Sequence, residues 1–158
     1  MMRADQVRRM PMALSAVGAL ALAIIPLPSA LGALRPDFLV LVVFYWSIES
    51  PRAGGLALAF FAGLALDVIN GMVLGQHALA LTLTAAWATH LRLRLRVFSI
   101  LSQTLTIFAL LTAYQFILFW VDGAAGNPVT SFGRWLAPVI GAAIWPLLAG
   151  TLSRLRER

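Results

Sequence analysis

Apolar residues fill six long stretches of the chain, and short segments rich in Gly, Pro or charged residues separate them. A helix that crosses about 30 Å of hydrocarbon needs roughly 20 mostly apolar residues, or fewer where its flanks reach the interface. By this measure the pattern predicts six transmembrane helices, over residues 11–27, 37–48, 53–73, 77–91, 98–121 and 135–152. None of these stretches alternates apolar and polar residues as barrel strands do. The predicted fold class is all-α: a polytopic membrane protein in which residues 1–158 form one integral-membrane domain.

The second stretch is short for a span, because its 12 residues would rise only about 18 Å as a helix. A re-entrant segment is the alternative. With six crossings, one side of the membrane receives Arg3, Arg8, Arg9, Arg52, Arg92, Arg94, Arg96, Arg154, Arg156 and Arg158. Only Arg35 and Arg134 fall on the other side. Basic residues concentrate on the cytoplasmic side of membrane proteins, so the distribution predicts six spans with both termini in the cytoplasm.

Composition supports the membrane interpretation. The chain is 61% hydrophobic and 11% charged, whereas an ordinary soluble domain is about 25% charged. Its mean hydropathy is +0.88. The net charge of +6 would suggest a nucleic-acid partner in a soluble protein, but here the arginines cluster between apolar stretches, so lipids and not nucleic acid are the predicted contacts. The sequence has no cysteine, which excludes disulfides, thiolate nucleophiles and the common zinc and iron–sulfur sites.

The beginning of the chain also resembles a secretory signal. A basic segment, MMRADQVRRM, precedes an apolar stretch and the small-residue segment PSALGA, and cleavage after Gly32 is an alternative to a retained first span. Because further apolar segments follow, we favour an uncleaved first span.

The segment GLALDVINGMVLGQHAL, residues 63–79, places a carboxylate in an apolar stretch. An Asp near the centre of a transmembrane helix costs about 2.5–3.5 kcal/mol, so Asp67 needs a partner. Helical spacing puts Gly63, Asp67, Asn70, Gly71 and Leu74 on adjoining parts of one face. Such a face combines small residues, which allow close packing, with polar groups that can bond to another helix.

The turn after this helix contains Gly71 and Gly75, which allow the chain to reverse, and Gln76 or His77 can cap exposed backbone groups. For Asp67 we favour a structural role, as interhelical bond or helix-end cap. A partner-binding or signalling position comes second. A proton or ion relay lacks a series of ionisable groups, and a metal site lacks the necessary ligand set.

Two arginine-containing motifs have both a structural and a binding interpretation. Arg35, Pro36 and Asp37 suit the start of the second helix, where Pro and an acidic residue are favourable; an external contact site is the alternative. The motif RLRLR contains Arg92, Arg94 and Arg96. We interpret it chiefly as a topology anchor, with binding of anionic lipid or an acidic cytoplasmic partner as the alternative.

Two other features concern helix packing. Tyr114 and Gln115 add polar atoms to the fifth stretch, where they are expected to make interhelical hydrogen bonds. Pro138 and Pro146 are expected to bend the last helix, because each removes a backbone donor.

The order RPDFLVLVVFYW, a turn containing Pro51, and then GLALDVINGMVLGQHAL closely resembles the rod shape-determining protein MreD family of the bacterial inner membrane. The resemblance implies a non-enzymatic scaffold that binds MreC and helps couple the MreB filaments to peptidoglycan synthesis by the elongation glycosyltransferase and transpeptidase. It implies no cofactor, metal or catalytic residue. The positions that match the motif, as partner-binding or structural candidates, are Arg35, Pro36, Asp37, Asp67, Gly71, Gly75, Gln76, His77 and Ala78.

One other class remains open beside the scaffold. Small six-span proteins include the substrate-binding subunits of vitamin transporters, which need polar or aromatic residues converging on a pocket; Asp67, Asn70, Tyr114 and Gln115 are the few candidates. An intramembrane enzyme would need a nucleophile with a base, or a metal set, and the sequence offers neither. Our working hypothesis is that the third and fourth helices, with the turn between them, form a partner-binding face.

Overall fold

The computed structural model of the chain describes residues 2–32, 35–53, 55–127 and 132–157, and the side chains within 9–32, 35–52, 55–127 and 132–155. Its elements are α1 (Met2–Ile24), α2 (Ser29–Gly32), α3 (Phe38–Glu49), the 3-10 turn η1 (Pro51–Ala53), α4 (Gly55–Asn70), α5 (Gln76–Val97), α6 (Ile100–Ala124), the 3-10 turn η2 (Phe132–Trp135) and α7 (Leu136–Glu157). The described residues contain no strand. The predicted all-α class is confirmed for this part of the chain.

The longer helices follow the predicted stretches in order, but several ends differ. Helix α1 begins at Met2 and continues through Pro11, and α4 ends at Asn70 instead of 73. Helix α5 runs on to Val97 instead of ending at 91, so the RLRLR motif is helical. Leu and Arg are good helix formers, and Leu95 within the motif is buried, which together explain the extension.

Two helical segments of the described chain are long and apolar enough to cross a bilayer, Ile100–Ala124 and Phe132–Leu155. Three apolar helices are shorter: Arg9–Ile24, Phe38–Glu49 and Gly55–Asn70. By length and composition the helices are compatible with a membrane protein, and the number of crossings stays a prediction.

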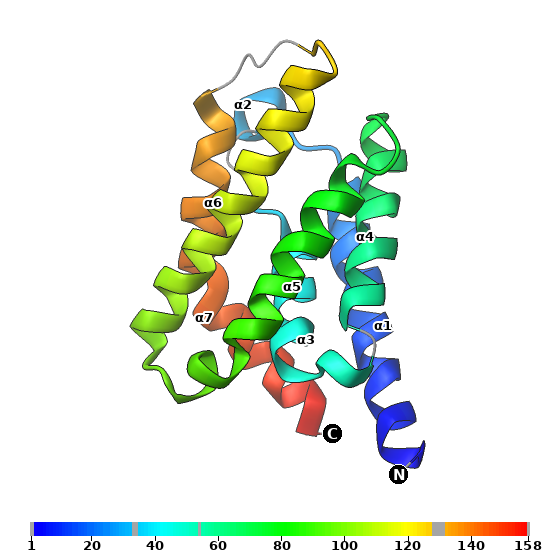
Figure 1. Cartoon of the computed structure of the whole chain (residues 1–158), viewed down its shortest axis with the longest axis vertical. Helices are drawn as coiled ribbons and strands as arrows, with labels where there is room; N and C mark the ends of the chain where they lie inside the picture. Colours follow the sequence, from blue (N-terminus) through cyan, green and yellow to red (C-terminus); the bar gives the residue numbers. More distant parts are fainter. Residues whose placement is uncertain (1, 33–34, 54, 128–131, 158) are drawn as a thin grey trace.

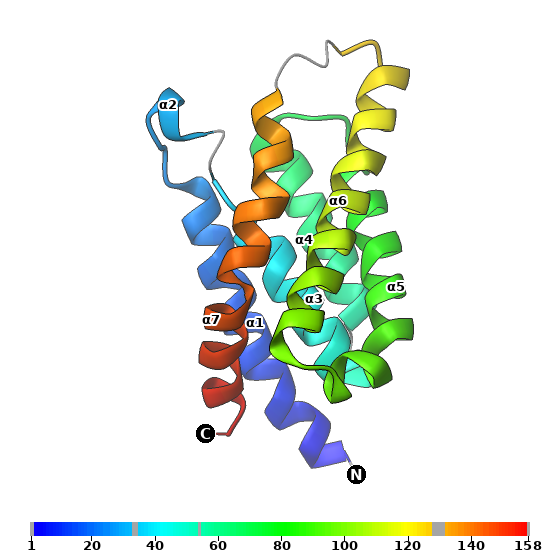
Figure 2. The ribbon, with the colours of Figure 1, turned by 90° about the vertical axis from the view of Figure 1, so that its left-hand side faces the viewer.

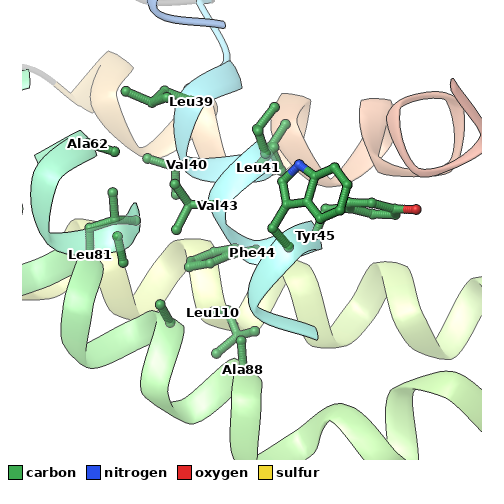
Figure 3. Close-up of a cluster of buried hydrophobic side chains, with 14 of the residues drawn as sticks. Leu39, Val40, Leu41, Val43, Phe44, Tyr45, Ala62, Leu81, Ala88 and Leu110 are labelled. Carbon is green, nitrogen blue, oxygen red and sulfur yellow. The ribbon is translucent and has the colours of Figure 1, made fainter. Parts of the chain in front are cut away.

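Helix α3 lies at the centre of the bundle and packs against α1, α4, α5 and α7 (Figure 1). Its residues 39–48 are all buried, which fits a helix that is apolar on every side. Figure 3 shows part of this core, labelled at Leu39, Val40, Leu41, Val43, Phe44, Tyr45, Ala62, Leu81, Ala88 and Leu110. Trp46, also fully buried in α3, donates a hydrogen bond from Nε1 to Ser15 Oγ of α1, at 2.8 Å.

The elements divide between two ends of the bundle (Figures 1 and 2). Both chain termini, η1 and the connection between α5 and α6 lie at one end, which we call the arginine-rich end because it carries Arg52, Arg92, Arg94, Arg96 and Arg154. Helix α2, the turn between α4 and α5, and the connection between α6 and α7 lie at the other, the α2 end. The predicted loop 122–134 belongs here, and its residues 128–131 lie outside the described ones.

Helix α7 continues through Pro146 and changes direction about halfway along its length (Figure 1). Proline has no N–H to bond the carbonyl of the preceding turn, and its ring crowds that turn. The bend predicted at Pro146 is therefore present.

Candidate functional site

The turn between α4 and α5 is closed by the carboxylate of Asp67, in the last turn of α4. Oδ2 accepts hydrogen bonds from the N–H of Gly75, at 2.8 Å, and of Ala78, at 3.4 Å. Oδ1 accepts from the backbone N–H and from ring Nδ1 of His77, both at 2.8 Å. The first N–H groups of a helix have no partner inside it, and the residue before α5 is Gly75, which has no side chain to cap them. Asp67 supplies the missing acceptor from the preceding helix.

Two glycines give this turn its shape. Gly71 has a φ of 62° and Gly75 a φ of 100°, both in the region that side chains disfavour. The predicted chain reversal at these glycines is present. The capping group is the carboxylate of Asp67, in the helix-end role that we favoured for it. Capping by Gln76 or His77 is not what the structure shows: His77 donates to Asp67, and the Gln76 side chain bonds to Asp122.

Gly63 allows α4 and α5 to approach each other closely. A Cβ at this position would lie 2.3 Å from the Cα of Ala78 and 2.5 Å from its backbone N, too close for any side chain. The close approach brings the carboxylate of Asp67, one turn further along α4, within bonding distance of the start of α5. Asp67 is 0% exposed, and its bonds offset the cost of burying a charge.

Gln76, the first residue of α5, joins a second network at the α2 end. Its Nε2 donates to Asp122 Oδ1 in the last turns of α6. Asp122 Oδ2 accepts from Arg134 Nη1, at 2.8 Å, in η2. The side chain of Asp122 is 5% exposed and that of Arg134 is 25% exposed, so this ion pair is largely screened from solvent. It ties the start of α5 to the end of α6 and the start of α7.

The motif at residues 35–37 lies beside α6. Asp37, just before α3, accepts a hydrogen bond at 3.4 Å from Gln115 Nε2 of α6, the interhelical type of bond expected of Gln115. Arg35 donates from Nη1 to the carbonyl of Ile25, at 3.0 Å. Residues some 40 positions apart in the sequence, Asp37 and His77, thus line the same space.

That space is an open cavity of about 420 Å³ at the α2 end, which we call the polar cavity; it is lined by Ser29, Gly32, Arg35, Asp37, His77, Gln115, Leu118, Arg134 and Ala137. It exists because the central helix is short. Helix α3 begins only at Phe38, near the level of Gln115, whereas α6 continues to Ala124, about 13 Å further along its axis.

The polar cavity presents both donors and acceptors. Two guanidinium groups, one imidazole and one carboxylate line it, and the buried Gln115 Oε1 has no hydrogen-bond partner among the described residues. Because the Asp67 carboxylate accepts from Nδ1 of His77, that nitrogen carries the proton. The ring stands 6.4 Å from that of Tyr114. The arrangement suits polar or charged groups of a partner or ligand. Within the described chain, no three His, Asp or Glu side chains group in a way that could hold a metal ion.

The structure separates the predicted site residues into three sets. Arg35, Asp37 and His77 line the polar cavity, and Pro36 is half-buried beside them. Asp67, Gly71, Gly75 and Gln76 shape the turn and the contacts under it. Asn70 and Leu74 are exposed and belong to neither buried network.

The third set consists of the arginines of the RLRLR motif and lies at the arginine-rich end, far from the cavity. Arg92 is half-buried, and Arg94 and Arg96 are exposed. Arg96 Nη2 donates to the backbone carbonyl of Glu49, at 2.9 Å, and to its Oε2, at 3.2 Å.

Sequence reasoning missed Asp122 and Arg134 as site residues. The signal was available: Asp122 ends an apolar stretch of the same kind as the one that holds Asp67, and Arg134 is one of only two arginines assigned to its side. Asp122 accepts from both Arg134 and Gln76, and because Gln76 lies 46 positions earlier in the chain, only the fold brings them together.

Fold and site together define a class: an all-helical protein with apolar helices suited to a membrane, in which Asp67, Gln76, His77 and Asp122 are buried at one end of the bundle. The sequence model of the rod shape-determining protein MreD family matches residues 5–154. The chain belongs to that family. It is 29% identical over 144 residues to the rod shape-determining protein MreD of Haemophilus influenzae, across 89% of this chain and 86% of that protein. No solved structure matches the chain.

The resemblance drawn from RPDFLVLVVFYW and GLALDVINGMVLGQHAL is thereby confirmed. Family membership supports a role in rod shape determination, within the machinery that gives the cell its shape.

Proposed function

We propose that this chain is a six-span, non-enzymatic scaffold of the bacterial inner membrane that binds MreC on its outer side. In this proposal both termini are cytoplasmic, and the scaffold helps couple MreB to peptidoglycan synthesis by the elongation glycosyltransferase and transpeptidase. The observation that carries the proposal is the convergence of the two family motifs. Residues 35–37 and 67–78 meet at one end of the bundle, around a single cavity and turn.

Charge supports the proposed orientation. Arg52, Arg92, Arg94, Arg96 and Arg154 gather at the end that holds both termini, and Arg35 and Arg134 are at the α2 end. Arg134 is also paired with Asp122, so the excess of positive charge at the α2 end is small. The positive-inside bias then assigns the arginine-rich end to the cytoplasm.

The absence of cysteine from the sequence makes this orientation directly testable. Asn127→Cys introduces a thiol at the exposed α2 end, and Arg154→Cys introduces one at the exposed arginine-rich end. A membrane-impermeant maleimide should label Asn127→Cys in intact cells and Arg154→Cys only after permeabilisation. The reverse result would overturn the orientation and the outer placement of the site.

The proposed partner surface is the turn between α4 and α5 with the adjoining helix faces. Asp67, Gly71 and Gly75 hold the turn in one conformation. Its three central residues remain exposed: Met72 at 40%, Val73 at 55% and Leu74 at 70%. A rigid, apolar tip on an outer surface is the kind of feature that a partner's residues can bury, and a few such residues dominate the energy of an interface.

Co-purification of MreC tests this surface with a matched pair of variants. Leu74→Ala and Leu101→Ala remove the same side chain from positions that are 70% and 71% exposed, at opposite ends of the bundle. We expect Leu74→Ala to lower the recovery of MreC several-fold and to round the cells, and Leu101→Ala to do neither. Asp67→Leu or Gly71→Leu should also weaken recovery, because each distorts the turn. If every variant accumulates normally and keeps both MreC and rod shape, this surface is not the partner site.

The polar cavity supports a second candidate, a substrate-binding subunit of a vitamin transporter. Its volume of about 420 Å³ lies within the range of small-molecule sites, about 300–1,000 Å³. Native mass spectrometry of the purified protein and an uptake assay test this candidate. A bound metabolite, with uptake lost in His77→Ala, would favour transport. An empty cavity and normal uptake in cells lacking the protein would exclude it.

A further inference from the structure

A second cavity, of about 190 Å³, opens at the arginine-rich end between α3, α5, α6 and α7. We call it the Trp145 cavity. Its wall is apolar at Ile48, Leu95 and Ala149, aromatic at Tyr45 and Trp145, and polar at Glu49, Arg96, Gln103 and Ser153. The Glu49 carboxylate is paired with Arg96. It shares no residue with the polar cavity at the α2 end, and neither the family resemblance nor the proposed partner surface involves it.

The bend of α7 shapes this cavity. Trp145 stands directly before Pro146, the proline inside α7, a helix that changes direction about halfway along its length (Figure 1). Residues of the second half of α7, including Ala149, form one wall, and Gln103 near the start of α6 lies across from them. Gln103 Nε2 is already bonded to the carbonyl of Leu95, at 2.6 Å, so it helps to form the wall and is not left to bind a ligand.

Trp145 carries an unsatisfied donor in this wall. The residue is 4% exposed, and its Nε1 has no hydrogen-bond partner among the described residues. Buried indole N–H groups usually find an acceptor, because leaving one without a partner costs free energy. Trp46 of α3, the other buried Trp, does have an acceptor, Ser15 Oγ. A ligand oxygen in the cavity would supply the acceptor that Trp145 lacks.

Arg96 supplies positive charge beside the cavity. Its side chain is 48% exposed, and only its Nη2 is bonded, to Glu49. A guanidinium has five N–H donors in a planar fork that fits phosphate oxygens. Arg92, Arg94 and Arg154 lie at the same end, and Glu49 is the only carboxylate among the side chains described there. The field around this opening therefore favours an anion.

We propose that the Trp145 cavity binds an anionic phospholipid of the membrane leaflet at the arginine-rich end. The phosphate binds the free donors of Arg96, and an ester carbonyl oxygen accepts the Nε1–H of Trp145. The glycerol end of an acyl chain lies against Ile48, Leu95 and Ala149. The volume suffices, since an apolar cavity of about 150 Å³ accommodates benzene. Basic pockets between helices at the inner membrane surface are suited to such lipids.

The proposal rests on the membrane placement of the chain under "Proposed function" and not on its binding of MreC. An acidic protein segment would share the charge preference. The lipid is favoured because much of the wall is apolar and because Trp145, whose buried N–H lacks an acceptor, is part of it; together these suit one oxygen atom followed by hydrocarbon.

The experiment uses the purified full-length chain in uncharged detergent and measures bound lipid by native mass spectrometry during titration with phosphatidylglycerol or phosphatidylethanolamine. The wild type should bind phosphatidylglycerol about tenfold more tightly. Trp145→Phe should weaken that binding about fivefold, because it removes the N–H with the five-membered ring while keeping an aromatic ring in the wall. Trp87→Phe, at a residue 55% exposed, makes the same change outside the cavity and should leave binding unchanged. Arg96→Gln should weaken binding about tenfold, and Arg94→Gln, which changes an arginine outside the wall, less than about twofold.

Several outcomes would overturn the proposal. One is equal affinity for the two lipids, and another is an equal effect of Trp145→Phe and Trp87→Phe. A third is that a glutamate-rich decapeptide binds and displaces phosphatidylglycerol with higher affinity, which would identify a protein ligand.

Because Arg96→Gln also removes a bond to Glu49, its thermal unfolding is measured alongside, and Trp145→Phe decides if Arg96→Gln fails to fold. Binding of MreC by the same variants is scored separately, so either proposal can fail alone.

Discussion

The carboxylate of Asp67 accepts hydrogen bonds from both the backbone N–H and the ring Nδ1 of His77, ten positions later in the chain, each at 2.8 Å. One side chain therefore does two things. It satisfies the N-terminal turn of α5, and it fixes the orientation of an imidazole that lines the polar cavity. The register of α4 against α5 and the geometry of the cavity depend on the same group.

Replacing Asp67 should therefore destabilise the protein. Asp67→Asn keeps one carbonyl oxygen but turns an amide NH2 towards N–H donors, and we expect the free energy of unfolding to fall by about 1–3 kcal/mol. Asp67→Leu, which removes every acceptor, should cost at least as much. The measurement is thermal unfolding in detergent. Asn70→Ala is the control, because Asn70 is exposed one turn away and should stay within about 0.5 kcal/mol of the wild type. An unchanged unfolding temperature for Asp67→Leu would contradict the capping role.

Gly63→Ala should separate α4 from α5. The new Cβ would lie 2.3 Å from the Cα of Ala78, and a backbone atom cannot move away as a flexible side chain can. Overpacking of this kind costs about 1–3 kcal/mol or more. Thermal unfolding of Gly63→Ala should therefore begin several degrees lower.

The matched control is Gly18→Ala in α1, where a Cβ would meet nothing within 4 Å. There we expect a gain of about 0.5–1 kcal/mol, because Ala favours the helix. If both variants shift the unfolding temperature in the same direction, the tight contact at Gly63 is not what limits stability.

The sequence predicted those parts of the fold that depend on local pattern. The apolar run at residues 39–48, broken only by Ser47, indicated a helix, and α3 covers it. Its burial on all sides, at the centre of the bundle, was not predicted. Glycines at 71 and 75 indicated a turn, and both have a positive φ. A buried carboxylate required partners, and Asp67 has them.

The same local pattern could not predict which residues of different helices contact each other. Helical spacing assigns Asp67 to a face of its own helix, but it does not say that backbone N–H groups of α5 face it. Asn70 was grouped with Asp67 by helical spacing; it is the last residue of α4, and its side chain is exposed while Asp67 is buried. The bond between Gln76 and Asp122 joins positions 46 residues apart, and no local period connects them.

Gly75 should tolerate a side chain less well than Gly71. Neither site has an atom within 4 Å of a new Cβ, so the cost is backbone strain alone. Gly71, with a φ of 62°, lies in the left-handed helical region, where a non-glycine residue costs about 1–2 kcal/mol. Gly75, with a φ of 100°, lies at the edge of that region, further from its usual φ of about 57°. Gly75→Ala should therefore lower the unfolding temperature more than Gly71→Ala, and Gly71→Asn should be the mildest, because Asn tolerates this region best. Equal shifts for all three would indicate that the turn relaxes.

The ion pair between Asp122 and Arg134 should be more strongly coupled than that between Glu49 and Arg96. Arg134→Gln leaves a carboxylate that is only 5% exposed with Gln76 as its remaining partner among the described residues. Losing one member of a buried pair costs about 3–5 kcal/mol. The double variant Asp122→Asn with Arg134→Gln should recover much of that loss, because the unpaired charge is gone. In the pair at the arginine-rich end, Arg96 is 48% exposed, and solvent screening should limit its coupling to about 0–1 kcal/mol.

Double-mutant cycles on thermal or denaturant unfolding in detergent measure both coupling energies with the same readout. The comparison also separates structure from function at the α2 end. If the double variant at Asp122 and Arg134 regains stability yet still loses MreC, the charges themselves belong to the partner surface. If it regains both, the pair serves only to hold η2 against α6. A coupling energy at Asp122 and Arg134 no larger than that at Glu49 and Arg96 would mean that water reaches the α2 end far more freely than the burial of Asp122 implies.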